Sequence, residues 1–301
     1  MLRLLICGLT LLLVTPLVEA AESVRAVLVT GASTGIGRKI TESLARDGYF
    51  VYAGARKEED LKALAGIRNV QAIRLDVTDA QQVDAAVQTI TKAGRGLYGL
   101  VNNAGIATVG SLATMKPEEF DLLMAVNVAG PYHVTRAFQP LIASQQGRIV
   151  NIGSLSGTMA TAQLMAYSMS KHAMEAFTDS LAAQMEPLGV QVSVIEPGNY
   201  DTQIGKSATA RMGVETAIAD RSRYPQPDDV AVTVKQALFE QKPRRRYLVV
   251  PVQSEAEIVI RKHIERLVQL NEGQLYTYDR ETLVKMLDQA LAGSLPRTKA
   301  P

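Results

Sequence analysis

The sequence predicts an α/β fold in which one doubly wound parallel sheet carries helices on both faces. From Ser23 onward, apolar runs of strand length alternate with segments of helical periodicity. The first run, Ala-Val-Leu-Val-Thr at residues 26–30, leads directly into a glycine-rich turn. Strands that alternate with helices in this way form βαβ units. No repeat or low-complexity linker divides the body, so we expect one domain over residues 24–251.

The expected elements follow the apolar pattern in chain order. In the segment 81–93, for example, apolar side chains at 83, 86, 87 and 90 share one helical face. The expected strands are residues 26–30, 50–55, 70–75, 98–102, 148–152, 191–196 and 246–250. The expected helices are residues 36–47, 59–65, 81–93, 117–145, 166–185 and 227–240, the fourth interrupted near Gly130-Pro131. The poorly periodic stretch 202–224 predicts a substrate loop, and residues 252–301 a helical C-terminal extension.

Composition excludes several classes of protein. Of the 301 residues, 47% are hydrophobic and 21% charged, so the chain can bury a core and is not disordered throughout. A net charge of +2 gives no electrostatic footprint for nucleic acid. The single cysteine, Cys7, excludes an intrachain disulfide and any cysteine-rich metal site.

The first twenty residues differ from the rest. Arg3 precedes the apolar run Leu4–Val14, and Val18-Glu19-Ala20 resembles a small-residue cleavage site. This pattern predicts a secretory signal peptide, with an uncleaved membrane anchor as the alternative. Either would place the protein outside the cytosol or at a membrane, and the side of the membrane stays open. Arg3 favours a cytosolic N-terminus and a translocated domain.

The turn after the first strand has the glycine spacing Gly-x₃-Gly-x-Gly. Glycines allow a tight turn, and the N-terminus of the helix that follows attracts a diphosphate. An ordinary strand–helix connection is the alternative. We expect a dinucleotide to bind at Thr30, Gly31, Ser33, Thr34, Gly35, Ile36 and Gly37.

The end of the second strand favours NADP(H) over NAD. An NAD site places an acidic side chain there for the ribose 2′-hydroxyl, whereas an NADP site needs a cation. No acidic residue lies between Tyr49 and Lys57, and Arg56 stands where a 2′-phosphate would bind. The alternative is that Arg56 is an ordinary solvated loop residue.

A serine, a tyrosine and a lysine follow the fifth strand. Ser154 comes directly after it, and the next expected helix contains Tyr167 and Lys171. Residues four apart share a helix face, so both side chains can point at one site. A neighbouring ammonium lowers the pKa of a phenol. One such pair is common by chance, and alone it does not identify an active site.

Together, these motifs resemble the short-chain dehydrogenase/reductase family. They occur in the order Thr30-Gly31-x₃-Gly35-x-Gly37, Asp76, Asn102-Asn103-Ala104-Gly105, Asn127, Ser154, Tyr167-x₃-Lys171 and Pro197-Gly198. The resemblance covers about Val24–Pro251 and implies a single Rossmann-type domain with a seven-stranded parallel sheet. Residues 196–200 and the extension look most like the retinol and hydroxysteroid dehydrogenase branch. Many members of that branch prefer NAD, which is in tension with Arg56.

The resemblance also implies roles for individual residues. Tyr167 is the general acid/base, Ser154 hydrogen-bonds the same substrate oxygen, Lys171 lowers the pKa of Tyr167 and holds the nicotinamide ribose, and Asn127 shapes a water path. Further cofactor contacts are implied at Asp76, Val77, Asn103, Ala104, Gly105, Pro197, Gly198 and Thr202. Direct hydride transfer needs no metal. Relatives form dimers or tetramers through helices corresponding to Gly130–Ser144 and Ala166–Met185.

The leading functional hypothesis is an NADP(H)-dependent oxidoreductase acting on a hydrophobic secondary alcohol or ketone, such as a steroid, retinoid or other lipid. The expected substrate loop supplies Ile204, Ala208, Ala210, Met212 and Val214, with no polar anchoring cluster. A 3-oxoacyl-thioester reductase is the alternative within the enzymes. A cofactor-binding sensor or scaffold without catalysis is the alternative outside them. The apolar positions of residues 258–270 are expected to pack over the pocket mouth, with membrane contact as the alternative.

Overall fold

Seven parallel strands form one sheet in the computed structural model, which describes residues 24–213, 215 and 218–293. Their order across the sheet is β3-β2-β1-β4-β5-β6-β7. The strands are β1 (Ala26–Val29), β2 (Phe50–Ala55), β3 (Val70–Arg74), β4 (Gly99–Asn102), β5 (Arg148–Ile152), β6 (Gln191–Pro197) and β7 (Arg246–Val249). The expected seven-stranded, doubly wound sheet is thereby confirmed. The signal peptide or anchor expected at residues 1–20, and Cys7 within it, lie outside the described residues.

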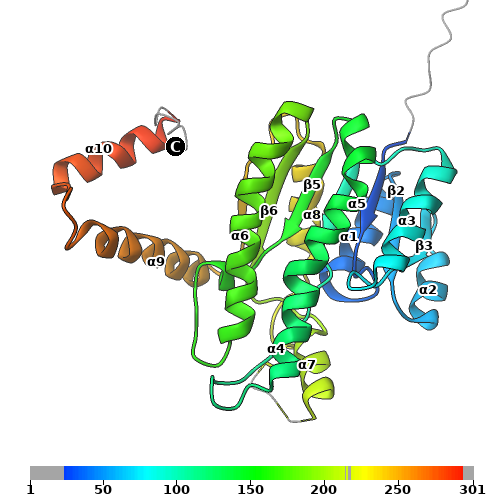
Figure 1. Ribbon diagram of the computed structural model, residues 1–301, viewed down its shortest axis with the longest axis horizontal. Helices are drawn as coiled ribbons and strands as arrows, with labels where there is room; N and C mark the ends of the chain where they lie inside the picture. The colour runs from blue at the N-terminus through cyan, green and yellow to red at the C-terminus, as the bar shows by residue number, and fades with distance from the viewer. Residues whose placement is uncertain (1–23, 214, 216–217, 294–301) are drawn as a thin grey trace, which may run out of the picture.

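Helices cover both faces of the sheet (Figure 1). The α-helices are α1 (Gly35–Arg46), α2 (Glu58–Ala65), α3 (Ala80–Ala93), α4 (Pro117–Met124), α5 (Gly130–Ser144), α6 (Met165–Met185), α7 (Ile204–Met212), α8 (Asp228–Phe239), α9 (Gln253–Asn271) and α10 (Arg280–Leu291). One buried cluster joins the sheet to α1, α2 and α8, and a second joins it to α3, α5 and α6. Successive strand residues supply the two clusters alternately, as a sheet buried on both sides requires.

The helical stretch expected over 117–145 is interrupted earlier than Gly130-Pro131. A π-helical turn, η1 (Ala125–Ala129), lies between α4 and α5. Pro131 has no N–H to give to the preceding turn, and the wider π turn comes directly before it. Gly130 must be small, because a Cβ there would lie 2.6 Å from Val77 Cγ2. The π turn carries Asn127, so the irregularity falls on an expected site residue.

The expected loop over 202–224 was wrong in one part, because α7 forms within it. Tertiary contacts, not periodicity, hold this helix. Ala208 is fully buried, and the Arg211 guanidinium binds the Glu119 carboxylate at 2.8 Å and the Ala107 carbonyl at 2.6 Å. Contacts of this range cannot be read from local sequence, which explains why periodicity missed the helix.

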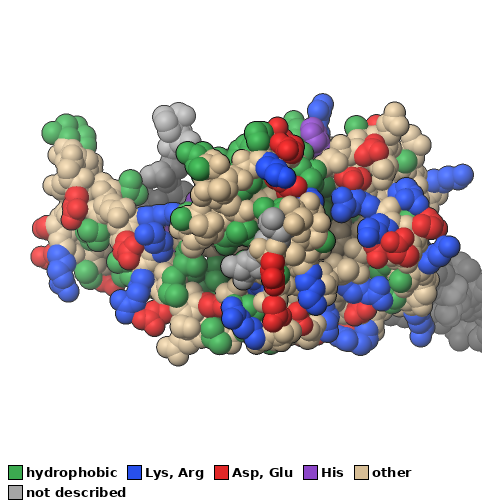
Figure 2. Space-filling model, turned by 90° about the horizontal axis from the view of Figure 1, so that it is seen from below, with side chains coloured by type: hydrophobic (Ala, Val, Ile, Leu, Met, Phe, Trp, Pro, Cys, Tyr) green, Lys and Arg blue, Asp and Glu red, His purple; other side chains and the backbone are tan. Residues whose placement is uncertain are grey.

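The C-terminal extension forms two helices, not one continuous segment. Helix α9 leaves the body next to the end of β7, and α10 projects away from the sheet (Figure 1). Of all α9 and α10 residues, Val259 alone is buried. Apolar side chains gather where the extension meets the body (Figure 2). Among the described residues, no helix is both long enough and apolar enough to cross a membrane.

A chain of buried amides and hydroxyls ties α5 and α6 to the middle of the sheet. The Asn102 amide on β4 donates to Thr135 Oγ1 on α5 and to Asn151 Oδ1 on β5, both at 2.9 Å. Asn151 in turn donates to Thr178 Oγ1 on α6 at 2.9 Å. Asn102 and Asn151 are also direct register partners. This hydrogen-bonded network therefore fixes the position of α6, which carries Tyr167 and Lys171, against the sheet.

Replacing Asn151 with Ala is expected to lower the free energy of unfolding by about 2–3 kcal/mol. The change removes two hydrogen bonds from a fully buried residue and leaves polar partners without them. Urea unfolding followed by circular dichroism measures the loss. The matched control is Gln88→Ala on the exposed face of α3, for which we expect a change within about 0.5 kcal/mol. Equal effects from the two variants would contradict the stabilising role of this hydrogen-bonded network.

Candidate active site

The candidate site lies at the carboxyl edge of the sheet, where the glycine turn, the Asn102–Gly105 segment and the turn at Ser154 all begin. Parallel strands bring their carboxyl ends to one edge, and β1 and β4 flank the point where the strand order reverses. That switch point is where sheets of this kind bind their ligands. Residues separated by more than a hundred positions therefore meet here.

The glycine turn has the shape of a phosphate cradle. Gly31 and Gly35 adopt positive φ angles of 63° and 54°, which favour glycine. A Cβ on Gly37 would collide with the Gly31 carbonyl and the Asn103 amide. Helix α1 begins at Gly35, and its N-cap Thr34 makes no side-chain capping bond, so first-turn N–H groups remain available to an anion. Ser33 and Thr34 lie on the turn as expected.

Asn103 locks the glycine turn to the end of β4. Its side-chain amide donates to the carbonyls of Thr30 at 2.9 Å and Gly31 at 3.0 Å. The Thr30 hydroxyl accepts from the backbone N–H groups of Asn103 and Ala104, each at 3.0 Å. The expected cleft residues thus hold the cradle in place, and Gly105 continues the segment toward Asn127.

The segment after β6 closes the cradle from the other side. Pro197 ends the strand, and Gly198 donates to the Val249 carbonyl at 2.8 Å. Thr202 lies against the glycine turn, where a Cβ on Gly35 would be 3.2 Å from Thr202 Cβ. These three expected cofactor positions therefore lie at the carboxyl edge of the sheet, with Thr202 against the glycine turn. Ile36, on the first turn of α1, packs toward the core beside it.

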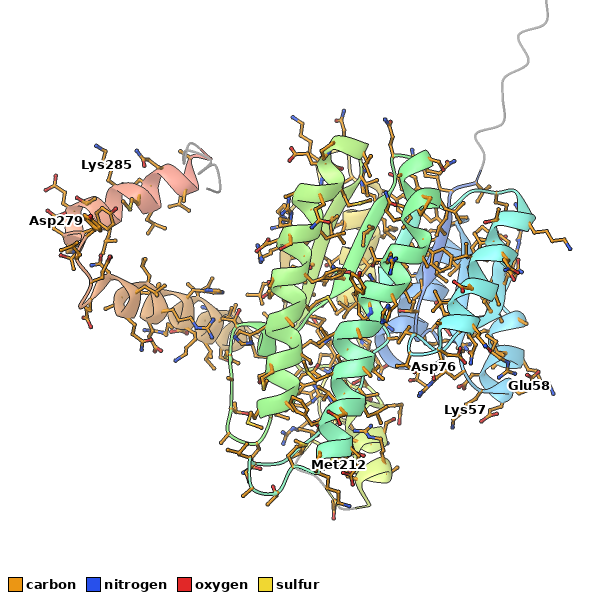
Figure 3. All side chains as sticks on the ribbon, viewed as in Figure 1. Lys57, Glu58, Asp76, Met212, Asp279 and Lys285 are labelled. Carbon is orange, nitrogen blue, oxygen red and sulfur yellow. The ribbon has the colours of Figure 1, made fainter. Side chains whose placement is uncertain are left out.

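Arg56 and Asp76 follow the carboxyl ends of β2 and β3. Arg56 is 61% exposed, and its guanidinium lies 3.7 Å from the Asp76 carboxylate. Asp76 and Lys57 lie on the side of the molecule that carries α2 (Figure 3). Sequence analysis missed Arg74, whose guanidinium donates to the Arg56 carbonyl at 2.7 Å. Val77 is buried, beneath α5. An exposed cation thus follows the end of β2, and a carboxylate lies beside it.

Asn127 is buried and fully engaged. Its carbonyl oxygen accepts from the Ile106 N–H at 2.9 Å, and its amide donates to the Ile106 carbonyl at 2.9 Å and to Ser170 Oγ at 3.1 Å. Ser170 then donates to the Tyr167 carbonyl at 2.7 Å. The π turn is therefore bonded to the helix of the tyrosine.

The structure brings Ser154, Tyr167 and Lys171 together. Lys171 is buried and donates to the carbonyl of Ile152, the last residue of β5, at 2.8 Å. Its Nζ lies 5.6 Å from the centre of the Tyr167 ring. Ser154 caps a short 3-10 turn, η2 (Leu155–Gly157), by accepting from the Ser156 N–H at 3.1 Å. Tyr167 and Ser154 are hydrogen-bonding neighbours.

Burial governs the protonation of the pair. It raises the pKa of the Tyr167 phenol above its ordinary value, while the Ser154 hydrogen bond and the Arg221 charge oppose the rise. Burial also lowers the pKa of Lys171 to about 8, and the Glu175 charge opposes that fall. At neutral pH the phenol therefore keeps its proton and the lysine is mostly charged.

Arg221 is a second residue that sequence analysis missed. Its guanidinium donates to the Tyr200 carbonyl at 2.8 Å and to Asn199 Oδ1 at 3.1 Å, and so fastens residues 218–224 to the end of β6. An arginine in a polar stretch carries no local signal for such a role. In the described part of the chain, no group of three or more His, Cys, Asp or Glu residues could hold a metal.

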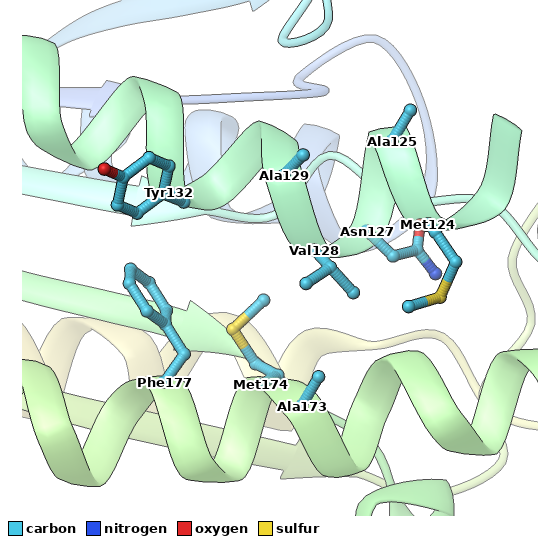
Figure 4. A pocket seen from close by; sticks show the side chains of 9 residues that line it. All are labelled: Met124, Ala125, Asn127, Val128, Ala129, Tyr132, Ala173, Met174 and Phe177. Carbon is cyan, nitrogen blue, oxygen red and sulfur yellow. The ribbon is translucent and has the colours of Figure 1, made fainter. Parts of the chain in front are cut away.

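A separate apolar groove of about 480 Å³ runs between α6 on one side and the end of α4, the π turn and the start of α5 on the other (Figure 4). Asn127 borders it, but its wall is otherwise apolar. The other lining residues are Met124, Ala125, Val128, Ala129, Tyr132, Ala173, Met174 and Phe177. The groove therefore lies between the two helices expected to pair subunits, and not at the carboxyl edge of the sheet.

Comparison with known proteins identifies relatives of the chain. It is 38% identical over 186 residues to a D-beta-hydroxybutyrate dehydrogenase, mitochondrial, from Bos taurus (58% of this chain, 54% of the relative). It is 40% identical over 184 residues to Retinol dehydrogenase 5 from Mus musculus (59% of this chain, 57% of the relative). The matched region spans only about half the length of these relatives.

Solved structures share the fold. A metagenomic short-chain oxidoreductase in complex with NADP is 32% identical, with a TM-score of 0.63 over 76% of this chain and 98% of its own. A short-chain dehydrogenase/reductase from Burkholderia phymatum in complex with NAD is 25% identical, with a TM-score of 0.70 over 84% and 98%. The family model described as short chain dehydrogenase matches residues 25–213. The chain therefore belongs to the short-chain dehydrogenase/reductase family.

Proposed function

We propose that the protein is an NADP(H)-dependent oxidoreductase that transfers a hydride between nicotinamide and a hydrophobic secondary alcohol or ketone. The observation that carries this proposal is the convergence of Ser154, Tyr167 and Lys171 beside the glycine turn. When bound, a nicotinamide cofactor supplies or accepts the hydride. The protein's own residues then handle the proton and orient the substrate oxygen.

In this proposal Tyr167 is the general acid/base. Its phenol is protonated at neutral pH, the form that gives a proton to a carbonyl oxygen during reduction. The Ser154 hydroxyl donates a hydrogen bond to the same oxygen and favours the growing negative charge. The Lys171 ammonium stabilises the phenolate that remains and holds the nicotinamide ribose. The Asn127 amide, bonded to Ile106 and Ser170, orders the path by which a proton returns.

The substrate class rests on the character of the mouth of the site. Helix α7 carries Ile204 and Met212 at its two ends, and its Ala208 is fully buried. The relatives named for D-beta-hydroxybutyrate and retinol support alcohols as substrates, and retinol supports a hydrophobic one. A 3-oxoacyl thioester remains the second substrate class to test.

Replacing Tyr167 with Phe tests the catalytic proposal. We expect NADPH-dependent reduction of hydrophobic ketones to fall by about 10²–10⁴-fold, because the proton donor is gone. NADPH affinity, measured by fluorescence, should stay within about threefold, since the ring that packs in the site remains. Steady-state rates on retinoid, steroid and 3-oxoacyl-thioester substrates measure the loss, with Tyr132→Phe on the exposed face of α5 as the control. Undiminished turnover in the Tyr167 variant would contradict the mechanism, and NADPH binding without turnover in the wild type would favour a sensor.

Cofactor choice is proposed to depend on Arg56. The cation is exposed, no carboxylate of β2 competes with a 2′-phosphate, and Arg74 holds its backbone. The NADP complex of a relative supports this preference. Asp76 pairs with Arg56, so a bound 2′-phosphate would share the Arg56 guanidinium with this carboxylate.

Replacing Arg56 with Asp is expected to shift the ratio of NADPH to NADH affinity by at least about tenfold toward NADH. The change removes the phosphate partner and supplies an acceptor for the ribose hydroxyls. Titration of both cofactors by fluorescence measures the ratio. Arg46→Asp, a charge reversal at an exposed arginine on the last residue of α1, should leave it unchanged. An unaltered ratio in the Arg56 variant would rule out the phosphate role.

We also propose that two copies pair through α5 and α6. The groove between these helices is apolar, and Tyr132 beside it is 49% exposed. Two such helix pairs packed across a two-fold axis would bury the groove in a four-helix arrangement. Introducing Tyr132→Glu should convert a dimer or tetramer to smaller species by light scattering, because a charge is costly to bury there. Tyr276→Glu, at an exposed position between α9 and α10, is the control; a wild-type monomer would contradict the proposal.

A further inference from the structure

Helix α6 carries a column of functional groups that extends beyond the tyrosine and lysine. Tyr167, Lys171, Glu175 and Asp179 are spaced by four residues and so lie along one strip of the helix. The first two belong to the proposed catalytic site. The third and fourth both bind Arg246 at the start of β7. The column therefore connects the site to the edge of the sheet through charged groups.

The Glu175 carboxylate lies directly beneath the turn of Ser154. A Cβ on Gly153 would be 3.1 Å from Glu175 Oε1, and one on Gly157 would be 3.2 Å from the same atom. The two glycines flank Ser154, so this oxygen packs against the backbone on both sides of the serine. The side chain is 16% exposed, and Oε1 is buried without a hydrogen-bond partner among the described residues.

Arg246 holds the other oxygen of this carboxylate. Its Nε donates to Glu175 Oε2 at 2.9 Å, and its Nη2 donates to Asp179 Oδ2 at 2.6 Å. The buried Glu196 carboxylate on β6 lies 3.9 Å from Arg246 Nε. One arginine thus lies within 4 Å of three carboxylates, and Oε1 of Glu175 is left packed against the turn that carries Ser154.

The charges that face Glu175 come from four elements. They are Lys171 and Asp179 on α6, Glu196 on β6 and Arg246 on β7; from a fourth element, α9, the titratable group is His263, which interacts with Arg246 and whose pKa burial lowers. Lys171 is the one cation on the active-site side of Glu175 in this described set. Burial raises the pKa of both buried carboxyls, that of Glu196 to about 7; at Glu175 the Arg246 hydrogen bond and the Arg246 and Lys171 charges oppose the rise and favour the carboxylate.

We propose that Glu175 is a positioning residue of the Ser154–Tyr167–Lys171 site: its carboxylate, fixed by Arg246, is the counter-charge of the buried Lys171 ammonium and supports the turn that carries Ser154. This inference rests on the proposed function and extends it to a residue that touches neither substrate nor cofactor. A buried ammonium without a counter-charge loses its proton more easily, and a neutral lysine no longer stabilises the Tyr167 phenolate.

The test is Glu175→Gln, which keeps the size of the side chain and an oxygen for Arg246 but removes the charge. Lysine labelled with ¹³C at Cε reports the titration of Lys171 by NMR, with the signal assigned from Lys171→Met. We expect the pKa of Lys171 to fall from about 8 by a further 0.5–1.5 pH units or so. Removing the negative charge lowers the pKa of Lys171, so the ammonium that stabilises the Tyr167 phenolate is lost at a lower pH. The alkaline limb of kcat/KM for ketone reduction should therefore move to lower pH.

Asp179→Asn is the matched control. Asp179 binds the same arginine but is 52% exposed and lies one turn farther from Lys171. We expect it to leave the Lys171 titration and the pH profile within experimental error. Glu175→Asp retains the charge and should restore most of the wild-type pKa. If Glu175 had a structural role alone, Glu175→Asp and Glu175→Gln would instead change the Lys171 titration and the pH profile equally.

Lys171→Met measures the same coupling from the other side, and it serves if Glu175→Gln does not fold. Loss of the ammonium should raise the pKa of the Glu175 carboxyl, followed through ¹³C at Cδ, by the amount that Glu175 contributes to Lys171. An unchanged Lys171 titration in folded Glu175→Gln, or an unchanged Glu175 titration in Lys171→Met, would overturn the inference. Because both titrations are read without substrate, an inactive wild type would contradict the proposed function and leave this test intact.

Discussion

Asn151 and Lys171 fasten α6 to β5 at two levels, and the geometry of the site depends on that attachment. The Asn151 amide binds Thr178 in the middle of the helix, and the Lys171 ammonium binds the carbonyl of Ile152 at the end of the strand. The same strand then delivers Ser154. Helix and strand cannot slide past each other without breaking both contacts. The distance between the serine and the tyrosine is therefore set by the packing of α6 on the sheet.

The lysine that makes one of these contacts is buried, and burial disfavours its charge. The structure offsets this penalty with a carboxylate one turn along the helix and a carbonyl at the strand end. Burial raises the pKa of the Tyr167 phenol, whereas the Ser154 hydrogen bond and the Arg221 charge lower it. Electrostatic balance at the site thus involves groups on α6, β5 and the segment after α7. Changing the charge of any one of them alters the proton affinity of the others.

Most of the fold and much of the site could be predicted from the sequence, since the signals are local. The glycine turn, Asn103 and the Tyr167–Lys171 pair each sit where a strand or helix begins or ends, and short spacing encodes them. The rest depends on contacts between distant residues. Helix α7 is held by Glu119 from α4, and Arg56 is paired with Asp76 from the end of β3. No spacing rule predicts these partners. Glu175 does follow Lys171 by four residues in the sequence, but only its packing against Gly153 and Gly157 connects it to the site.

The protonation states of Tyr167 and Lys171 determine which proton transfer the resting site is ready to make. At neutral pH a protonated phenol beside a charged lysine is ready to donate a proton, as carbonyl reduction requires. Alcohol oxidation would first need that proton to leave a phenol whose pKa burial has raised. The Arg221 charge and the Ser154 hydrogen bond favour the phenolate, and the Lys171 ammonium, which the Glu175 charge helps to keep protonated, acts in the same sense. The resting charges therefore leave the phenol in the form that carbonyl reduction uses, whereas alcohol oxidation would start from the phenolate.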